Sequence, residues 1–182
     1  MNRDEAFEEL KIRLNHKDIL RHSLAVEAVM KEFARYYDAD VEIWGLAGLL
    51  HDIDIEKTAG DPEKHSIVAA QIIENFDIDE SIIYCIRSQN DYHTIPRKRK
   101  MDKVLYAANH LTHLITYCAD KLPDNNLSDV TPKMVLENIS KSDIEGINIE
   151  HIKHYIELNI TLLEFVEITL NAMQKNFDNT KM

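Results

Sequence analysis

Apolar residues recur at intervals of three and four along most of this chain, and few residues interrupt the pattern. Such spacing places apolar side chains on one face of a helix. Only 4 glycines and 4 prolines occur among the 182 residues, so breaks between long helices are scarce. No segment has the pattern of a convincing pair of strands. The sequence therefore predicts an all-α fold, a compact bundle of several helices.

Start signals help to position these helices. Asp40 is an expected N-cap, and Asp61 followed by Pro62 is another start signal, because proline loses nothing at the first helical position. Thr161 and Glu164 match a capping box. We expect a loop over residues 120–129 and helices over about 4–14, 18–35, 40–51, 62–76 and 100–119, with further helices starting at Asp79, at Thr131–Pro132 and at Thr161.

Composition restricts the partners and the compartment. The formal net charge of −11, from 32 acidic and 21 basic residues, repels nucleic acid and anionic membranes at long range. The charged N-terminal stretch lacks the apolar core of a signal peptide, and no stretch reaches the roughly 18–20 apolar residues of a membrane span. Cys85 and Cys118 lie among apolar residues, which favours buried thiols over a disulfide. We expect a cytoplasmic protein that binds neither nucleic acid nor membrane.

Two histidines and an aspartate are the strongest candidates for chemistry. His51 ends an apolar stretch that begins at Trp44, and Asp52 starts the next turn, so one corner presents an imidazole and a carboxylate together. His22 lies on a separate amphipathic helix. This nitrogen and oxygen ligand set suits Mn, Fe, Co, Ni or Zn. The alternative is that the histidines are hydrogen-bonded packing residues with no metal.

Several strings in this order resemble the HD superfamily of metal-dependent phosphohydrolases, and in particular its small single-domain HDIG-type proteins. The resemblance covers nearly the full chain, with divergent positions at the metal site. The matching strings are Arg21–Val26, Leu49–Asp54, Lys64–Ala70, Ile86–Asp91 with Ile95–Arg97, Lys103–Asn109, Gly146–Glu150 and Ile160–Phe165.

The resemblance implies a divalent metal ion (Mn, Fe, Co, Ni, Zn or Mg) held by His22, His51, Asp52 and a fourth ligand from the long late helix. In the family this fourth residue is an aspartate, whereas here it is Asn109. An amide oxygen removes one negative charge, so we expect weaker binding of a divalent ion.

The same family resemblance implies accessory residues for the pocket. Gln89 stands where members with a second metal or a phosphate site usually carry histidine, whereas His65 matches another accessory position. The chain therefore resembles a one-metal member of the family. His93 and Arg97 are further candidates for contacts with the substrate.

Catalytic roles in the family pattern begin with Asp52, which would bind the metal and orient the attacking water. Asp54 and Glu56 are near enough in sequence to accept a proton or to support the ligands, although solvated acids of a turn are an equally good interpretation. A group of basic residues would either meet substrate phosphates or be a solvated helix start: Lys57, Arg87, Arg97, Lys98, Arg99 and Lys100.

The remaining histidines have weaker assignments. His110 and His113 are alternatives to Asn109 as the fourth ligand, or else exposed or boundary residues of the helix. His151 and His154 are three residues apart on an expected helix and could hold a metal together, but with no third ligand nearby we expect them at the surface.

Together these observations predict a single domain over residues 1–182, with a metal-pocket core over about 18–120 and C-terminal helices over about 131–177 packed on it. Two functions stay open, and we favour the first. One is a metal-dependent phosphohydrolase with a mononuclear site, acting on a phosphomonoester or nucleotide as its small-molecule partner. The other is a catalytically degenerate binding or regulatory protein. The sequence is compatible with a homo-oligomer.

Overall fold

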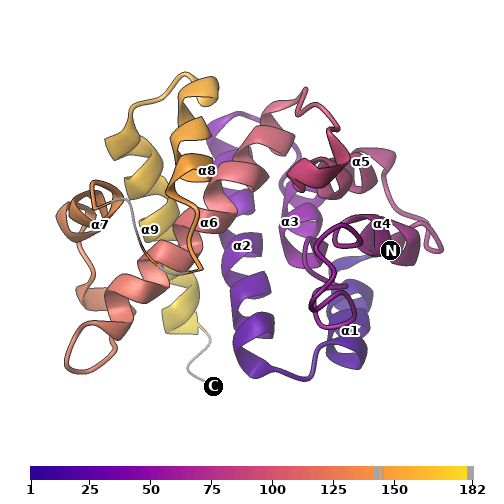
Figure 1. Ribbon diagram of the computed structural model, residues 1–182, viewed down its shortest axis with the longest axis horizontal. Coiled ribbons are helices and arrows are strands. Elements are labelled where there is room, and N and C mark those ends of the chain that lie inside the picture. Colours follow the sequence, from indigo (N-terminus) through magenta and orange to yellow (C-terminus); the bar gives the residue numbers. More distant parts are fainter. Residues whose placement is uncertain (142–143, 145, 180–182) are drawn as a thin grey trace.

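Helices make up almost all of the regular structure of the chain. The computed structural model describes residues 1–141, 144 and 146–179, and an isolated bridge between Ile144 and Ile147 is the strand-like pairing found there (Figure 1). The all-α prediction is confirmed. In the described residues the elements are α1 (Arg3–Arg13), α2 (Lys17–Tyr36), α3 (Val41–Leu50), α4 (Ile67–Ile73), α5 (Glu80–Ser88), η1 (Asp91–His93), α6 (Lys100–Asp120), η2 (Leu127–Asp129), α7 (Pro132–Ile139), α8 (Ile149–Lys153), η3 (His154–Leu158) and α9 (Leu162–Asn179).

Side-chain caps fix several of the helix starts that the sequence predicted. Asp40 accepts hydrogen bonds from the backbone N–H groups of Glu42 and Ile43, which opens α3. Thr161 and Glu164 form the expected reciprocal pair at the start of α9. Each cap satisfies N–H groups that have no partner within the helix.

The connection between α3 and α4 differs from the prediction. The expected helix from Asp61–Pro62 to Phe76 is wrong, because turns occupy residues 51–60 and 62–66 and α4 begins only at Ile67. Ser66 has φ 72°, a left-handed conformation that a continuous helix does not contain. The cap of α4 comes from Asp54, far upstream of the expected start.

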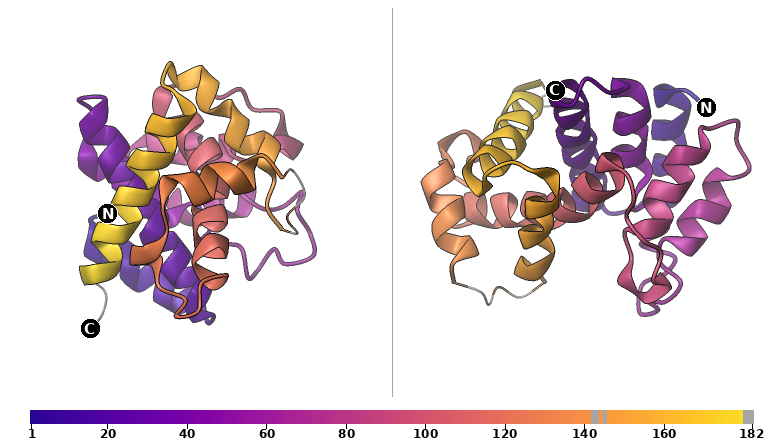
Figure 2. Two further views of the ribbon diagram at one scale, coloured as in Figure 1. Left: turned by 90° about the vertical axis from the view of Figure 1, so that its left-hand side faces the viewer. Right: turned by 90° about the horizontal axis from the view of Figure 1, so that it is seen from above.

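Two long helices, α2 and α6, cross in the middle of the molecule. Figure 1 shows α7, α8 and α9 on one side of this pair and α1, α3, α4 and α5 on the other, and Figure 2 shows the same division from two further directions. The helix α2 packs on α3, α6 and α9, and fully buried residues from all four helices share one core: Phe33, Leu49, Leu50, Leu111 and Phe165. This packing brings one face of α2 and one face of α6 beside the end of α3.

Predictions about the cysteines and about membrane spans can also be compared with the structure. Cys85 and Cys118 are both free and buried, as expected. Within the described residues, every helix is too short or too polar to cross a bilayer.

Candidate metal centre

Three side chains from distant parts of the chain converge at the C-terminal end of α3. One ligand atom from each of His22, His51 and Asp52 lies within 4.8 Å of the others. His22 comes from α2, His51 directly follows α3, and Asp52 begins the next turn. His51 is completely buried and Asp52 is 8% exposed. The structure thus brings together the three residues that the sequence singled out.

The unpaired atoms of His51 and Asp52 test whether this cluster fits a cation. His51 Nδ1 donates to the Gly48 carbonyl oxygen at 2.7 Å, so Nε2 carries the lone pair. That nitrogen is buried without a hydrogen-bond partner, 3.2 Å from Asp52 Oδ2. Asp52 Oδ1 also lacks a hydrogen-bond partner, and its ion-pair contact is His65 Nε2 at 3.4 Å. In the neutral ring His51 Nε2 and the carboxylate oxygen are both acceptors, so at this distance they need a positive charge, supplied either by a proton on Nε2 or by a bound cation. The donor set therefore fits a divalent ion.

Asn109 from α6 contacts this cluster through His22. Its Oδ1 is 2.8 Å from His22 Nε2, which donates to it in this arrangement. The Thr112 hydroxyl donates to the Asn109 carbonyl oxygen at 2.6 Å and lies 3.4 Å from His22 Nδ1. Ligation through His22 Nε2 would need its hydrogen to move to Nδ1, where the Thr112 oxygen can accept it.

Electrostatics favour the protonation states that a metal requires. Burial alone would raise the pKa of Asp52, but the His51, His65 and His22 imidazoles lower that pKa below its ordinary value. Burial lowers the pKa of His22, and His113 and His51 lower it further. At neutral pH Asp52 is therefore ionised and His22 is neutral.

Asp54 holds the neighbouring His65 in place. Its carboxylate accepts from His65 Nδ1 at 2.9 Å and from the N–H groups of Ser66 and Ala69. The other ring nitrogen of His65, Nε2, lies 3.4 Å from Asp52 Oδ1. Three donors already occupy this carboxylate. These contacts support a role for Asp54 in positioning His65, and they give less support to a role as proton acceptor.

Glu56 points to the start of α2. Its carboxylate accepts from the backbone N–H groups of Asn15 and His16 at 2.7 and 2.8 Å, and from the Asn15 side chain at 2.9 Å. These bonds anchor the helix that carries His22. They give no support to the catalytic role that the sequence suggested for Glu56.

Gln89 and His93 contact the backbone of the residues around the cluster. Gln89 Nε2 donates to the His51 carbonyl oxygen at 2.7 Å, and His93 Nε2 donates to the His65 carbonyl oxygen at 2.8 Å. Gln89 is buried, and its Oε1 has no hydrogen-bond partner. Both side chains thus support the centre from its backbone side.

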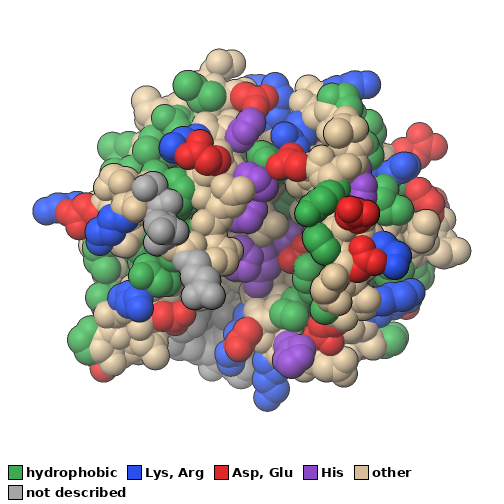
Figure 3. Space-filling view, viewed as in Figure 1, with side chains coloured by type: hydrophobic (Ala, Val, Ile, Leu, Met, Phe, Trp, Pro, Cys, Tyr) green, Lys and Arg blue, Asp and Glu red, His purple; other side chains and the backbone are tan. Residues whose placement is uncertain are grey.

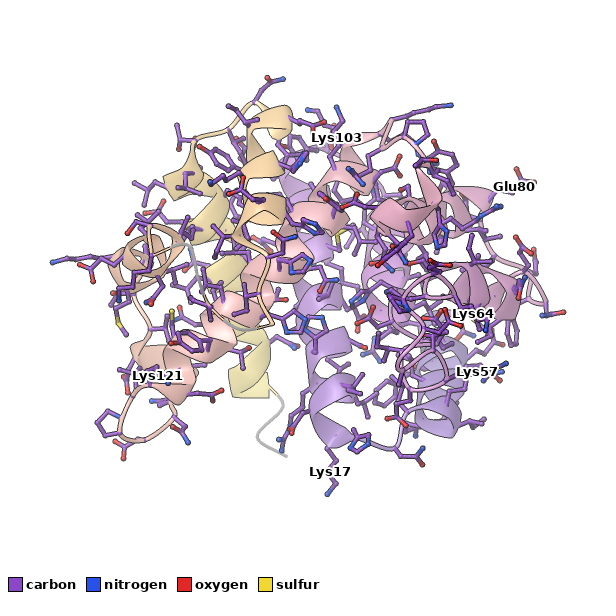
Figure 4. The ribbon with its side chains drawn as sticks, in the orientation of Figure 1. Lys17, Lys57, Lys64, Glu80, Lys103 and Lys121 are labelled. Carbon is purple, nitrogen blue, oxygen red and sulfur yellow. The ribbon has the colours of Figure 1, made fainter. Side chains whose placement is uncertain are left out.

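The basic residues do not converge on the cluster. Arg97 donates to Asp91 at 3.0 Å and to the Ser88 carbonyl oxygen at 3.2 Å, with its guanidinium 3.6 Å from the centre of the Tyr106 ring. Figure 4 shows Lys57 on the loops near α1 and α4, where it lines a separate hollow with Arg13. The other cations of the run lie over tyrosine rings elsewhere: Lys98 and Arg99 over Tyr84, and Lys100 over Tyr37.

A row of rings extends from the cluster along α6, and the sequence did not predict it. His113 stacks on His22 with ring centres 3.9 Å apart and planes 14° apart. Further along, His110 and His151 meet edge to face at 4.4 Å, and His151 stacks on Tyr106 at 4.4 Å. We call Tyr106, His110, His113 and His151 the ring row; Figure 3 shows histidine side chains along the middle of this face.

The sequence predicted that His151 lies at the surface, and this prediction is wrong. The His151 side chain is half-buried because α8 packs on α6. His154 is 40% exposed and pairs with Glu157. The spacing of Tyr106, His110 and His113 on one helical face was the available signal. His113 stacks on a candidate ligand and is not itself part of the metal-binding cluster among the described residues.

Comparisons with known proteins agree with this geometry over part of the chain. Ribonuclease Y of Mycoplasma genitalium is 30% identical over 77 residues, which cover 42% of this chain and 16% of that protein. An uncharacterized protein of Methanocaldococcus jannaschii is 35% identical over 71 residues, 36% of this chain and 41% of that protein. The chain spans less than half of either relative. No solved structure gave a significant match.

A family-level match covers the whole candidate centre. The HD domain matches residues 19–123, which include His22, His51, Asp52 and Asn109. HD domains define a superfamily of metal-dependent phosphohydrolases. Because the match covers more than half of the sequence, this chain belongs to the HD domain family.

Proposed function

We propose that this protein is a metal-dependent phosphohydrolase of small phosphomonoesters or nucleotides, with one divalent ion held by His22, His51, Asp52 and Asn109. The observation that carries the proposal is the pair of buried, unpartnered acceptors, His51 Nε2 and Asp52 Oδ1, in a cluster with a ligand atom of His22. A divalent ion bound there would polarise a phosphoryl oxygen and lower the pKa of the attacking water.

The residues around the ion would divide the remaining work. Ionised Asp52 would bind the ion and accept a hydrogen bond from the water, which orients it. Burial alone would lower the pKa of His65, but its hydrogen bond to Asp54 and the charge of Asp52 raise that pKa above its ordinary value. His65 would therefore bind a proton more readily than a free imidazole, and in its protonated form it would offset the negative charge of a phosphoryl group.

Gln89 supports a site with one metal ion. A second ion usually needs a further imidazole or carboxylate, and the Gln89 amide is instead committed to the His51 carbonyl oxygen through Nε2. The hydrogen bond between Asn109 and His22 supports the second candidate function, a binding or regulatory protein without turnover, because it partly satisfies the centre without an ion.

A reloading experiment tests the proposal. Chelator-treated protein is supplied separately with Mn, Fe, Co, Ni, Zn or Mg, and phosphate release is measured from phosphomonoesters, nucleotides and cyclic dinucleotides. We expect metal-dependent hydrolysis that is lost in His51→Gln and Asp52→Asn but kept in the control His16→Ala, whose side chain is exposed at the start of α2. Metal binding without turnover would favour the binding protein, and the absence of metal binding would contradict the phosphohydrolase.

A further inference from the structure

The ring row begins at the candidate metal centre and leads away from it. His51 and His22 meet edge to face with ring centres 5.2 Å apart, and His113 stacks on His22. The His110 ring lies 6.4 Å from the His113 ring, one turn back along α6. His110 in turn contacts His151, and His151 contacts Tyr106. A molecule whose phosphate lies at the centre would therefore have flat ring faces beside the rest of its structure.

Two members of the row present surface to a ligand. His113 is exposed, and His110 is half-exposed. His110 also lines a hollow of about 410 Å³ with Gly146, Ile147, Asn148, Ile149 and Glu150. That volume is within the usual range of small-ligand pockets, about 300–1,000 Å³. The hollow gives space for a planar group against the His110 ring.

The charges around the row argue against further phosphates in this part of the site. Arg97 lies over Tyr106, but its charge is already paired with Asp91. The same aspartate accepts from the Tyr106 hydroxyl at 2.7 Å and contacts His151 at 3.2 Å, so the far end of the row carries a carboxylate. Because Arg97 and Asp91 neutralise each other, the far end of the row offers no free positive charge that would bind a second anionic group, whereas an uncharged ring needs none.

We propose that the His110 and His113 rings form a platform for the nucleobase of a nucleoside 5′-monophosphate whose phosphate lies at the metal centre. Because the two ring planes are 53° apart, the base stacks on one ring and meets the other at an angle. The platform is the exposed part of the ring row together with the hollow beside His110. This inference rests on the proposed function for the position of the phosphate, and it deepens that function by naming the substrate class. Base stacking on rings tolerates different bases, so we expect little discrimination among them.

Binding measurements can isolate the contribution of the base. The probes are the methylenephosphonate analogues of adenosine 5′-monophosphate and of ribose 5-phosphate, which lack a hydrolysable ester bond and differ only by the base. Titration calorimetry at pH 8 with metal-loaded protein should show about tenfold tighter binding of the adenosine analogue. His110→Ala and His113→Ala should lose this preference, and His110→Phe should keep it because the ring face remains.

The outcomes separate this inference from the proposed function. His16→Ala, which changes an exposed histidine elsewhere, should keep the wild-type preference. Equal binding of the two probes by the wild type, or an unchanged preference in His110→Ala and His113→Ala, would overturn the platform even if metal-dependent hydrolysis persists. If hydrolysis is absent, adenosine alone should still bind metal-free wild type more tightly than metal-free His110→Ala, and equal binding would again overturn the platform.

Discussion

The candidate centre has an amide beside it where the family pattern has a carboxylate. The Asn109 side-chain oxygen lies 2.8 Å from His22 Nε2, beside one of the candidate ligand atoms. The centre contains one carboxylate, Asp52, in place of two. This single difference sets the charge that balances a bound cation.

Asn109→Asp should raise the affinity for Mn²⁺ by about tenfold or more, because an added carboxylate strengthens the binding of a hard cation. The same change should lower the stability of the metal-free protein, since it adds a second negative charge beside Asp52. Titration calorimetry and thermal unfolding measure the two effects. Asn171→Asp, on the exposed face of α9, adds the same charge elsewhere and should do neither. If Asn109→Asp leaves the affinity unchanged while His22→Ala abolishes binding, residue 109 is not a ligand.

Individual side chains differ in how well the sequence predicts their positions. His22, His51 and Asp52 were predicted to meet, and their ligand atoms do lie within 4.8 Å. Asp54 and Glu56 follow the same turn in sequence, but each carboxylate turns away to cap or anchor a helix. Those partners lie 15 and 41 residues away in sequence, so no local pattern could reveal them.

At the scale of helices, the close approach of α2 and α3 positions the ligands. A Cβ at Gly48 would lie 2.7 Å from the Val26 carbonyl oxygen and 2.8 Å from Met30 Cγ. The backbones can therefore approach only because residue 48 is glycine. The Gly48 carbonyl oxygen also holds His51, so the same contact fixes the His51 ring.

Gly48→Ala should reduce the free energy of unfolding by about 2–3 kcal/mol and weaken metal binding. The added methyl group would push the backbone of α2 away from α3, and this shift would move His22 away from His51. Gly45→Ala, on the same helix, is the matched control. Its new Cβ would meet the flexible Lys31 side chain, so we expect an effect within about 1 kcal/mol. Urea unfolding and metal titration of both variants test this; equal losses would show that the helix approach at residue 48 is not critical.

Helix starts with a local cap were predictable, and those set by distant contacts were not. Asp40 and Thr161 cap the helices that they precede, as the sequence indicates. Asp61–Pro62 has the same kind of signal, but Asp54 and the left-handed Ser66 delay α4 to Ile67. The sequence places His151 and His154 at helical spacing, but it does not reveal that α8 packs against α6.

At the scale of the whole molecule, Asp91 joins segments from three parts of the chain. It follows α5, accepts from Tyr106 on α6, and contacts His151 on α8. Arg97 pairs with it as well. These contacts connect the region on the α5 side of the centre with the C-terminal helices on the other side.

Stability should depend on pH through Asp91. Burial alone would raise the pKa of Asp91, but the Tyr106 hydrogen bond and the Arg97 charge lower that pKa below its ordinary value. A lowered folded-state pKa stabilises the protein above the ordinary value near 3.9, and this stabilisation is lost as pH falls through the folded-state pKa. The stability difference between wild type and Asp91→Asn should therefore be larger at pH 6 than at pH 3. Urea unfolding across this range measures it, and a difference that is constant or grows toward pH 3 would contradict the assignment.

Anomalous X-ray diffraction from crystals grown with Co²⁺ or Zn²⁺ tests the metal centre most directly. We expect one strong anomalous peak about 2.0–2.2 Å from His51 Nε2, a His22 ring nitrogen and an Asp52 carboxylate oxygen, with the Asn109 oxygen facing it. The peak should be absent from His51→Gln crystals grown in the same way. An empty cluster at saturating metal, or a well-occupied ion elsewhere with these three side chains unchanged, would show that His22, His51 and Asp52 do not form a metal centre.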